Sequence, residues 1–502
     1  MILCTCFRKY FKSILNMKNC FVTLLLFLTF LINNCAQPNK KYAPEIEQRI
    51  QQVESHLGTW AQIGDSSNWT LQERMKFYHV NGVSIAVISN YKLEWARGYG
   101  WADSTARQPV TTSTLFQAAS LSKSLNGVGI LKLVQDGKLN LHTDINEYLK
   151  KWKFPYDSLS RGKKISAANL LNHTAGLTIH GFPGYKQTDS IPTITDILDG
   201  KRPSNTKAVR SSFEPSLRFQ YSGGGTTISQ LLIEEITGQS YDKYMWENVL
   251  RPIGMISSSF AQPPQKEKEL FLAKAYYNNG NEVKGKYHIY PEQAAAGLWT
   301  NPTDMAKYII ETQLALKGRS SKVLSQEMTV TRLTPYIDSN SALGVFVTKK
   351  DGNKYFGHSG GNEGFVSQYY GSFENGNGVV VMANTLNFQI LHEIVNSVAA
   401  IYNWKNFYTP VIKKLHPVKN DILGMYVGRY KLQNDTLVIR PGPDGLVLID
   451  NGTELKMYFT SDTDFFILEA QNAEMNFTND SSGKVNGFTL KQGRELRAFK
   501  LD

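Results

Sequence analysis

F-Q-A-A-S-L-S-K-S-L-N-G-V-G-I-L-K-L-V-Q-D-G-K-L, residues 116–139, is the stretch that decides the fold of this chain. Its apolar residues recur at helical spacing, and Gly137 is placed to end the helix. Ser120 then lies in the first turn, and Lys123 lies on the same helix face, where its amine reaches the hydroxyl. The unpaired amides of a first turn point to where an oxyanion would develop, so Ser120 is a candidate nucleophile.

The S-x-x-K pattern alone is weak evidence, because two common residues at one spacing recur by chance. It occurs six times in this chain, at Ser89, Ser120, Ser160, Ser204, Ser240 and Ser481. Only Ser120 follows a strand-like segment, V-N-G-V-S-I-A-V-I, and opens a long apolar helix pattern. The context therefore selects Ser120.

The composition is that of an ordinary globular protein. The chain has 502 residues, of which 41% are hydrophobic, and this suffices for two or three domains with buried cores. The formal charge of +12 includes four basic residues ahead of an apolar N-terminal segment. After residue 41 no dense block of Lys and Arg is interleaved with aromatic residues. We therefore expect a mildly basic solvated surface and no nucleic-acid partner.

Residues 1–35 are interpreted as a leader that directs export to the periplasm or cell envelope. The apolar run F-V-T-L-L-L-F-L-T-F-L-I is too short to span a bilayer but has the length of a signal-peptide core. Cys35 follows L-I-N-N, which resembles a degenerate lipoprotein cleavage site. Two alternatives stay open: Cys35 carries a lipid anchor, the one membrane contact we expect, or it lies near an ordinary cleavage point. All four cysteines lie in this leader, so the body has no disulfide and no thiolate metal site.

Residues 36–410 are predicted to form the main domain. Strand-like and helix-like segments alternate through it, which indicates a mixed α/β or α+β fold. The expected helices are 120–136, 167–171, 227–237, 241–249, 302–316 and 390–402, and the expected strands are 83–89, 92–99, 354–357, 365–373 and 378–384.

Residues 420–502 are predicted to form a second, small all-β domain. From Gly424 onward, short apolar or alternating runs are separated by the turn signals P-G-P-D-G, D-N-G, D-S-S-G and Q-G. This spacing is typical of a barrel-like sheet. The segment contains no catalytic cluster, so we interpret it as a packing or partner-binding appendage.

Two further motifs carry candidate catalytic groups. Tyr221 lies in R-F-Q-Y-S-G-G-G-T, just before a helix-like segment, and a phenol beside a cation can act as a general base. His358 lies in Y-F-G-H-S-G-G-N, between two strand-like segments, where Gly360 and Gly361 would let a substrate lie against the strand. The amide of Gly361 is then a candidate oxyanion donor. His173, in N-H-T-A-G-L, is interpreted as a structural residue that braces a turn.

The three motifs, in the order S-x-x-K, Y-S-G and H-S-G, resemble those of the penicillin-recognising serine hydrolases. That superfamily includes class C β-lactamases, D-Ala-D-Ala carboxypeptidases, D-aminopeptidases and related esterases. The resemblance extends to L-L-N-H-T-A-G-L, R-P-I-G-M and A-A-G-L-W-T-N-P-T-D-M-A, and covers roughly residues 44–400. It implies an α+β, β-lactamase/transpeptidase-like fold, in which helices flank an antiparallel sheet and a helical subdomain is added. The C-terminal segment is similar to a lipocalin-like β domain.

The resemblance also implies a role for each motif residue. Ser120 would be the acylated nucleophile, Lys123 its partner amine and Tyr221 the proton shuttle. The amides of Ser120 and Gly361 would form the oxyanion hole. His358 would be the fourth catalytic residue, at the start of the third motif, and Ser120, Gly223, Ser359, Gly360 and Gly361 would contact the substrate or its oxyanion.

Two departures from the family pattern bear on the substrate. Gly223 stands where the tyrosine motif often has Asn, which implies a weaker grip on an amide side group. His358 stands where lysine is common, and a neutral imidazole does not hold a carboxylate as an ammonium does.

We therefore expect an exported serine hydrolase without a cofactor or metal, acting through an acyl-enzyme. Its partner would be a small-molecule or short-peptide substrate, namely an ester, a D-amino acid peptide or amide, or a β-lactam-like compound. An efficient β-lactamase is the less favoured reading. The alternative is a penicillin-binding sensor that is acylated slowly and is not turned over efficiently. The sequence does not indicate whether the protein forms an oligomer.

Overall fold

The computed structural model describes residues 42–64, 69–450 and 453–501. The predicted leader, with Cys35 and the other three cysteines, lies outside these described residues. Across the described ranges, no helix combines the length and the apolar character that crossing a membrane requires.

A seven-stranded antiparallel sheet forms the centre of the main domain. Its strand order is β4-β3-β2-β10-β9-β8-β7. Strand β10 pairs with β2, Val380 opposite Ala86, so the end of the domain lies beside its beginning. The strands are β2 (Gly82–Ser89), β3 (Lys92–Asp103), β4 (Gln108–Pro109), β7 (Phe346–Lys350), β8 (Asn353–Asn362), β9 (Phe365–Ser372) and β10 (Gly378–Ala383).

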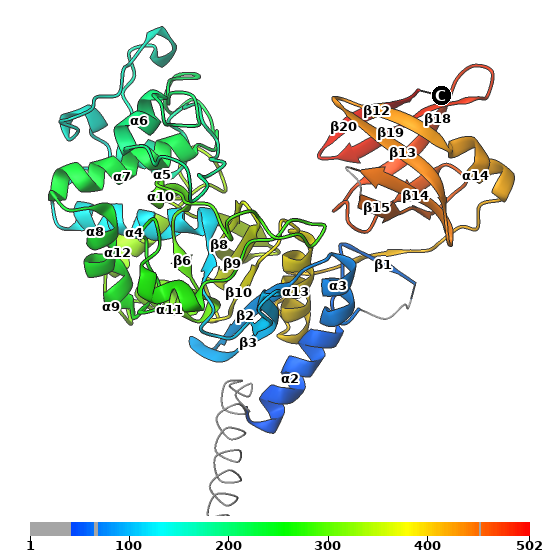
Figure 1. The fold of residues 1–502 in the computed structure, drawn as a ribbon, viewed down its shortest axis with the longest axis horizontal. Helices are drawn as coiled ribbons and strands as arrows, with labels where there is room; N and C mark the ends of the chain where they lie inside the picture. The colour runs from blue at the N-terminus through cyan, green and yellow to red at the C-terminus, as the bar shows by residue number, and fades with distance from the viewer. Residues whose placement is uncertain (1–41, 65–68, 451–452, 502) are drawn as a thin grey trace, which may run out of the picture. The chain divides into compact units, whose positions relative to one another are not determined.

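Helices cover both faces of this sheet. Every residue of β10 is buried, and so is all of β2 except its last residue, whereas a strand with one face in water would alternate. Figure 1 shows the sheet between α13 (Gln389–Ile401) and α11 (Pro302–Leu316). The α+β class that the sequence predicts is therefore confirmed.

The predicted helix at 120–136 is present as a short 3-10 turn, η1 (Ala119–Leu121), followed by α4 (Ser122–Gln135). Most of α4 is buried, including Asn126, because helices surround it. The Asn126 side chain donates to Ser229 Oγ of α7 (Gly223–Thr237) at 2.8 Å and accepts from the Tyr241 hydroxyl at 3.2 Å. These buried polar bonds fix how the helices around the nucleophile pack.

The remaining elements of the main domain are short. The predicted helices at 167–171 and 302–316 have those bounds, and the predicted 241–249 helix changes to a π-helical turn at Trp246. The elements are α2 (Pro44–Ser55), α3 (Leu71–Phe77), α5 (Ala167–Leu171), α6 (Ile194–Asp199), α8 (Tyr241–Met245), α9 (Arg251–Ile253), α10 (Gln293–Ala296), α12 (Gln326–Leu333), the paired strands β5 (Phe116–Gln117) and β6 (Trp299–Thr300), the 3-10 turns η2 (Ile145–Glu147), η3 (Ser158–Ser160) and η5 (Lys266–Phe271), and the π-helical turn η4 (Trp246–Leu250).

A nine-stranded antiparallel sheet follows, in the order β15-β14-β13-β12-β20-β19-β18-β17-β16. Its two end strands are neighbours in sequence, and the sheet curls into a nearly closed barrel, which confirms the predicted barrel-like domain. The elements are α14 (Asn420–Tyr426), β12 (Gly428–Leu432), β13 (Asp435–Gly442), β14 (Gly445–Asp450), β15 (Thr453–Lys456), β16 (Tyr458–Phe459), β17 (Asp464–Phe466), β18 (Glu474–Asn479), β19 (Val485–Gln492) and β20 (Arg494–Lys500).

Aromatic residues fill the barrel. The rings of Tyr426 and Phe477 stack with centroids 3.7 Å apart, and Phe465 stacks on Phe477 at 4.7 Å. Tyr430 and Phe488, both fully buried, pack at 5.3 Å. These rings, together with the aliphatic residues around them, form the apolar core of the barrel.

The barrel and the main domain share a junction. Strand β1 (Ala61–Ile63) pairs in parallel with β11 (Val411–Lys413), which precedes the barrel. Trp60 donates its indole N–H to the Ile467 carbonyl at 3.2 Å and packs edge-on against Phe466. The barrel is thus held by backbone pairing and by a small apolar cluster.

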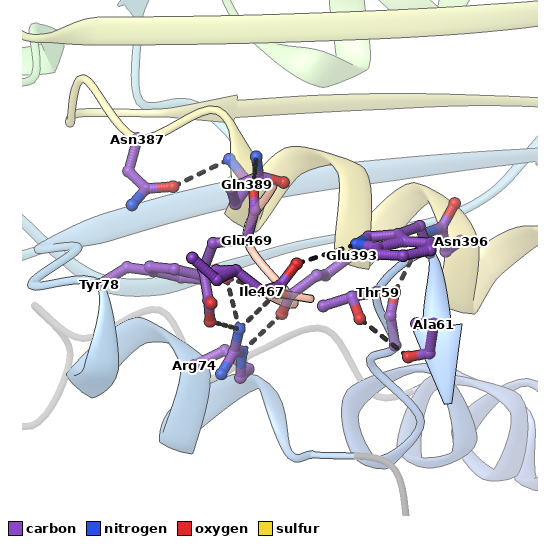
Figure 2. A network of polar contacts seen from close by, with 12 residues as sticks. Thr59, Ala61, Arg74, Tyr78, Asn387, Gln389, Glu393, Asn396, Ile467 and Glu469 are labelled. Carbon is purple, nitrogen blue, oxygen red and sulfur yellow. Dashed lines mark hydrogen bonds and ion pairs between the residues drawn. The ribbon is translucent and has the colours of Figure 1, made fainter. Parts of the chain in front are cut away.

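A buried ion-pair network lies at the same junction (Figure 2). Arg74 of α3 donates to the two carboxylate oxygens of Glu393, on α13, at 2.7 and 2.6 Å. The Tyr78 hydroxyl donates to Glu393 at 2.6 Å, and Glu469 of the barrel lies 3.5 Å from Arg74. The Arg74 guanidinium therefore forms ion pairs with carboxylates of both domains.

Candidate active site

Ser120 lies in a fixed turn between strand β5 and helix α4. The preceding residue, Ala119, is fully buried and has a positive φ of 50°, a conformation that costs energy for a residue with a side chain. The Ser122 hydroxyl donates to the Ala119 carbonyl at 2.6 Å and accepts from the Leu298 amide at 3.0 Å. These bonds hold the strained turn, and Ser120 stays partly exposed at its tip.

Lys123 reaches Ser120 as the sequence predicts. Its Nζ donates to Ser120 Oγ at 3.0 Å and to the Ala295 carbonyl of α10 at 2.7 Å. The residue is only 4% exposed. Because two acceptors fix the amine, it lies where it can exchange a proton with the serine hydroxyl.

Tyr221 lies beside this pair, directly before the N-cap of α7. Ser222 caps that helix by accepting from the Gly225 amide at 2.9 Å. The Tyr221 ring centroid is 5.0 Å from Lys123 Nζ. The structure thus places the Tyr221 ring beside the Lys123–Ser120 pair, although the two segments are about a hundred residues apart in the chain.

His173 braces Tyr221, which agrees with its interpretation as a structural residue. The two rings pack with centroids 4.3 Å apart, and the Ser222 amide donates to His173 Nδ1 at 3.2 Å. Burial, with Lys123 and His358 nearby, lowers the pKa of His173 well below its ordinary value. A neutral imidazole that accepts at Nδ1 is the form this contact requires.

His358 lies within strand β8, so the prediction that it lies between two strands is wrong. Strand β8 continues through Asn362, because the whole H-S-G-G segment pairs with β9, His358 opposite Tyr369. The pairing of β7 with β8 ends at Gly357. Beyond Gly357, the edge of β8 that does not pair with β9 faces the turn that holds Ser120.

The imidazole of His358 is buried and neutral. Burial, followed by the nearby Lys123 charge, lowers the pKa of His358 to about 3. Its Nδ1 bonds the Ser359 carbonyl at 2.6 Å, while the buried Nε2 has no partner among the described residues. The ring lies 5.2 Å from that of Phe346 and 6.3 Å from that of Tyr221, measured between centroids.

Gly360 and Gly361 place β8 against the nucleophile. A Cβ at Gly360 would lie 2.5 Å from the Ala118 carbonyl oxygen and 2.7 Å from the Ser120 amide nitrogen, so only glycine fits there. The Ser367 hydroxyl of β9 donates to the same Ala118 carbonyl at 2.7 Å. Ser359 and Gly361 remain exposed, and their strand edge is accessible to a ligand.

Gly223 faces the loop that contains His180 and Phe182, and no sequence motif predicted that contact. A Cβ at Gly223 would meet the Phe182 ring at 2.9 Å and the His180 carbonyl at 3.2 Å. His180 Nδ1 also bonds the Tyr221 carbonyl at 2.5 Å. The space that an Asn side chain would need is therefore taken by an aromatic ring, and Phe182 is a site residue that sequence reasoning missed.

Glu292 is a second group that the sequence did not single out. It is fully buried just ahead of α10, and neither carboxylate oxygen has a partner within the described part of the chain. Burial raises the pKa of Glu292 to about 8. The residue stands three positions before Ala295, whose carbonyl accepts from Lys123. Its place in P-E-Q-A-A-A-G-L-W is a helix-start pattern, which gave no sign of burial.

Known proteins share this sequence pattern. The sequence model of the Beta-lactamase family matches residues 69–393. Protein flp of Staphylococcus aureus (strain N315) is 26% identical over 343 residues, which cover 66% of this chain and 65% of flp, so the chain spans less than two thirds of that relative. Penicillin-binding protein 4* of Bacillus subtilis (strain 168) is 24% identical over 451 residues, 86% of this chain and 96% of the relative.

Solved structures share the fold. The octameric penicillin-binding protein homologue from Pyrococcus abyssi has a TM-score of 0.60 at 22% identity, covering 85% of this chain and 98% of that chain. The D-amino acid amidase from Ochrobactrum anthropi SV3, complexed with L-phenylalanine amide, has a TM-score of 0.54 at 21% identity, covering 72% and 99%. At these identities the likeness shows the architecture, a helix-flanked antiparallel sheet.

Proposed function

Because the chain belongs to the Beta-lactamase family of serine hydrolases, we propose that it hydrolyses an ester or a D-amino acid amide or peptide through an acyl-enzyme. One observation carries the proposal. The amine of Lys123 lies 3.0 Å from Ser120 Oγ and 5.0 Å from the centre of the Tyr221 ring. An amine at hydrogen-bond distance from a serine hydroxyl, with a tyrosine ring beside it, supports an activated serine nucleophile.

In the proposed acylation, Ser120 Oγ attacks the substrate carbonyl carbon while its proton passes to the member of the Lys123–Tyr221 pair that holds a free electron pair, the neutral amine or the phenolate. The carbonyl oxygen becomes an oxyanion that the amides of Ser120 and Gly361 stabilise. The C–O or C–N bond of the substrate then breaks, and the leaving group takes up the proton. Water attacks the acyl-enzyme in the second half-reaction, which releases the acid and restores Ser120.

Two features of the site favour an ester or amide over a β-lactam that carries a carboxylate. His358 is neutral because its pKa is lowered to about 3, so it does not offer the permanent charge that binds a carboxylate. Phe182, instead of an Asn amide, occupies the space at Gly223. The amidase of similar fold from O. anthropi, named for D-amino acid amides, supports the amide alternative.

The test is a substrate panel on the purified protein and on S120A. We expect sustained release of product from p-nitrophenyl esters or D-amino acid amides, and slow or no hydrolysis of nitrocefin. A fluorophosphonate probe should label the wild-type protein and leave S120A unlabelled. Equal labelling of S120A would refute the nucleophile, and rapid nitrocefin turnover would refute the substrate class.

A second candidate is a penicillin-binding sensor that acylates slowly and does not turn over. It is supported by the relative of B. subtilis, which bears the name penicillin-binding protein 4*. The kinetic course separates the two functions. A stoichiometric burst without a steady state indicates the sensor, whereas continuous release indicates the hydrolase.

We further propose that the protein is exported to the periplasm or cell envelope and that Cys35 carries a lipid. The proposal rests on the sequence of the leader, which lies outside the described residues. Incorporation of a labelled fatty acid that is lost in C35A would support the anchor. Export without incorporation would leave the ordinary cleavage alternative.

A further inference from the structure

Helix α13 carries a polar stripe that binds it to its surroundings. Gln389, Glu393, Asn396 and Ser397 recur on one helix face, at the spacing of successive turns. Asn396 donates to the Gly58 carbonyl at 3.0 Å, and Ser397 donates to the Val53 carbonyl at 2.8 Å. Glu393 accepts from Arg74.

The first residue of the helix makes the contact with the barrel. Gln389 Nε2 donates to the Glu469 backbone carbonyl at 2.7 Å (Figure 2). The backbone N–H of Gln389 donates to Asn387 Oδ1 at 2.8 Å, and the backbone N–H of Asn387 donates to Thr385 Oγ1 at 3.2 Å. The short segment between β10 and α13 is thus held internally and by the barrel.

Phe388, inside that segment, touches the candidate oxyanion strand. Its ring lies 3.0 and 3.3 Å from where a Cβ of Gly361 would be. Phe388 is half-buried and Gly361 is exposed, so the ring forms one wall beside an otherwise open strand edge. The adjacent residue of this strand, Gly360, packs against the backbone amide of Ser120.

We propose that Phe388 is a positioning residue, which holds Gly361 in register with the nucleophile turn, and that the barrel fixes Phe388 through the Gln389–Glu469 hydrogen bond. This inference rests on the proposed function. An oxyanion donor acts mainly in the transition state, so a displaced Gly361 lowers kcat more than it raises KM. The barrel thereby contributes to catalysis without supplying a group that touches substrate.

The first experiment replaces the ring in the full-length protein. F388A should lower kcat for a p-nitrophenyl ester by about tenfold, while KM changes by less than about twofold. The rate of fluorophosphonate labelling of Ser120 should fall by a similar factor. F388L, which keeps an apolar side chain at the contact, should restore most of the rate.

The second experiment tests the connection to the barrel. Q389A should lower kcat by about threefold, and F388A/Q389A should be no slower than F388A, because both act through one contact. N396A is the matched control, since it removes one hydrogen bond from the same face of the same helix. It should lower Tm by about as much as Q389A and leave kcat unchanged.

Several results would overturn the proposal. An F388A variant with normal kcat and raised KM would make Phe388 a substrate contact only. Equal kcat losses in N396A and Q389A would make the effect one of general stability. If the probe labels the wild-type protein and F388A at the same rate, this inference alone is refuted. If the wild-type protein neither reacts with the probe nor hydrolyses any ester, the proposed function is refuted as well.

Discussion

At the scale of the residue, His358 shows how burial sets charge. Its folded pKa of about 3 lies below the ordinary value of 6.5, because burial and the Lys123 charge both disfavour the cation. Between these values the unfolded chain binds a proton that the folded chain does not, so this residue's contribution to stability is lost as the pH falls from 6.5 toward 3.

This lowered pKa has a measurable result. We expect the His358 ring signals to show no NMR titration between pH 8 and pH 5, with assignment by comparison to H358Q. The pH profile of kcat/KM should show no inflection from His358 near pH 6.5. The profiles of the wild-type protein and H358Q should therefore have the same shape in this range. A titration of His358 with a midpoint near 6 would contradict the assignment of a neutral, buried imidazole.

Gly360 gives a second prediction at this scale. In G360A, the new methyl group would meet two backbone atoms, the Ala118 oxygen and the Ser120 nitrogen, neither of which can turn away. We expect the rate of Ser120 labelling to fall by about a hundredfold. G424A, where a Cβ meets nothing within 4 Å, is the control and should label normally. Normal labelling of G360A would show that β8 does not approach the nucleophile this closely.

Individual residues also mark what the sequence could predict. Ser120, Lys123 and Tyr221 could be proposed as site residues because each lies at the start of a helix or just before one, within a distinctive local pattern. Phe182 and Phe388 were not, since a lone phenylalanine is usual in a core, and their contacts with Gly223 and Gly361 join segments distant in the chain. Such contacts depend on the tertiary fold and leave no periodic signal.

At the scale of the element, boundaries followed local chemistry. The starts of α5 and α11 coincide with local signals, since Ser166 and Asn301 cap the two helices and α11 has Pro302 in its first turn. The extent of β8 was mispredicted because two glycines in H-S-G-G signal a turn. The partner strand β9 overrides that preference, and the turn lies instead at Gly364, with φ of 75°.

Helix α7 supplies the prediction at this scale. In S222A, the Gly225 amide loses its cap and the Thr178 carbonyl loses a donor at 3.0 Å. We expect a loss of about 1 kcal/mol in the free energy of unfolding, together with reduced labelling of Ser120, because Tyr221 adjoins the cap. The control is S240A, whose serine caps α8 without a side-chain hydrogen bond and should cost less. Equal losses measured by urea unfolding would contradict this account.

At the scale of the whole molecule, the Arg74 network joins the two domains. R74M leaves the buried carboxylate of Glu393 without its ion pair, and we expect a loss of about 3–5 kcal/mol in unfolding free energy. R74M/E393L removes the Arg74–Glu393 pair but leaves the Glu469 carboxylate without Arg74, so it should recover part of that loss. Chemical denaturation of both variants is the measurement. A double variant less stable than R74M would show that the pair itself, rather than the unpaired charge, dominates.

The parallel pairing of β1 with β11 has a consequence for the order in which the protein opens. Ala61 and Val411 pair although about 350 residues separate them in the chain, and the ladder that they begin has only three residue pairs. Val411 and Ile412 are also exposed to solvent. Deuterium should therefore enter the amides of this short ladder well before those of β10, because the β1–β11 pairing opens while the central sheet is still intact.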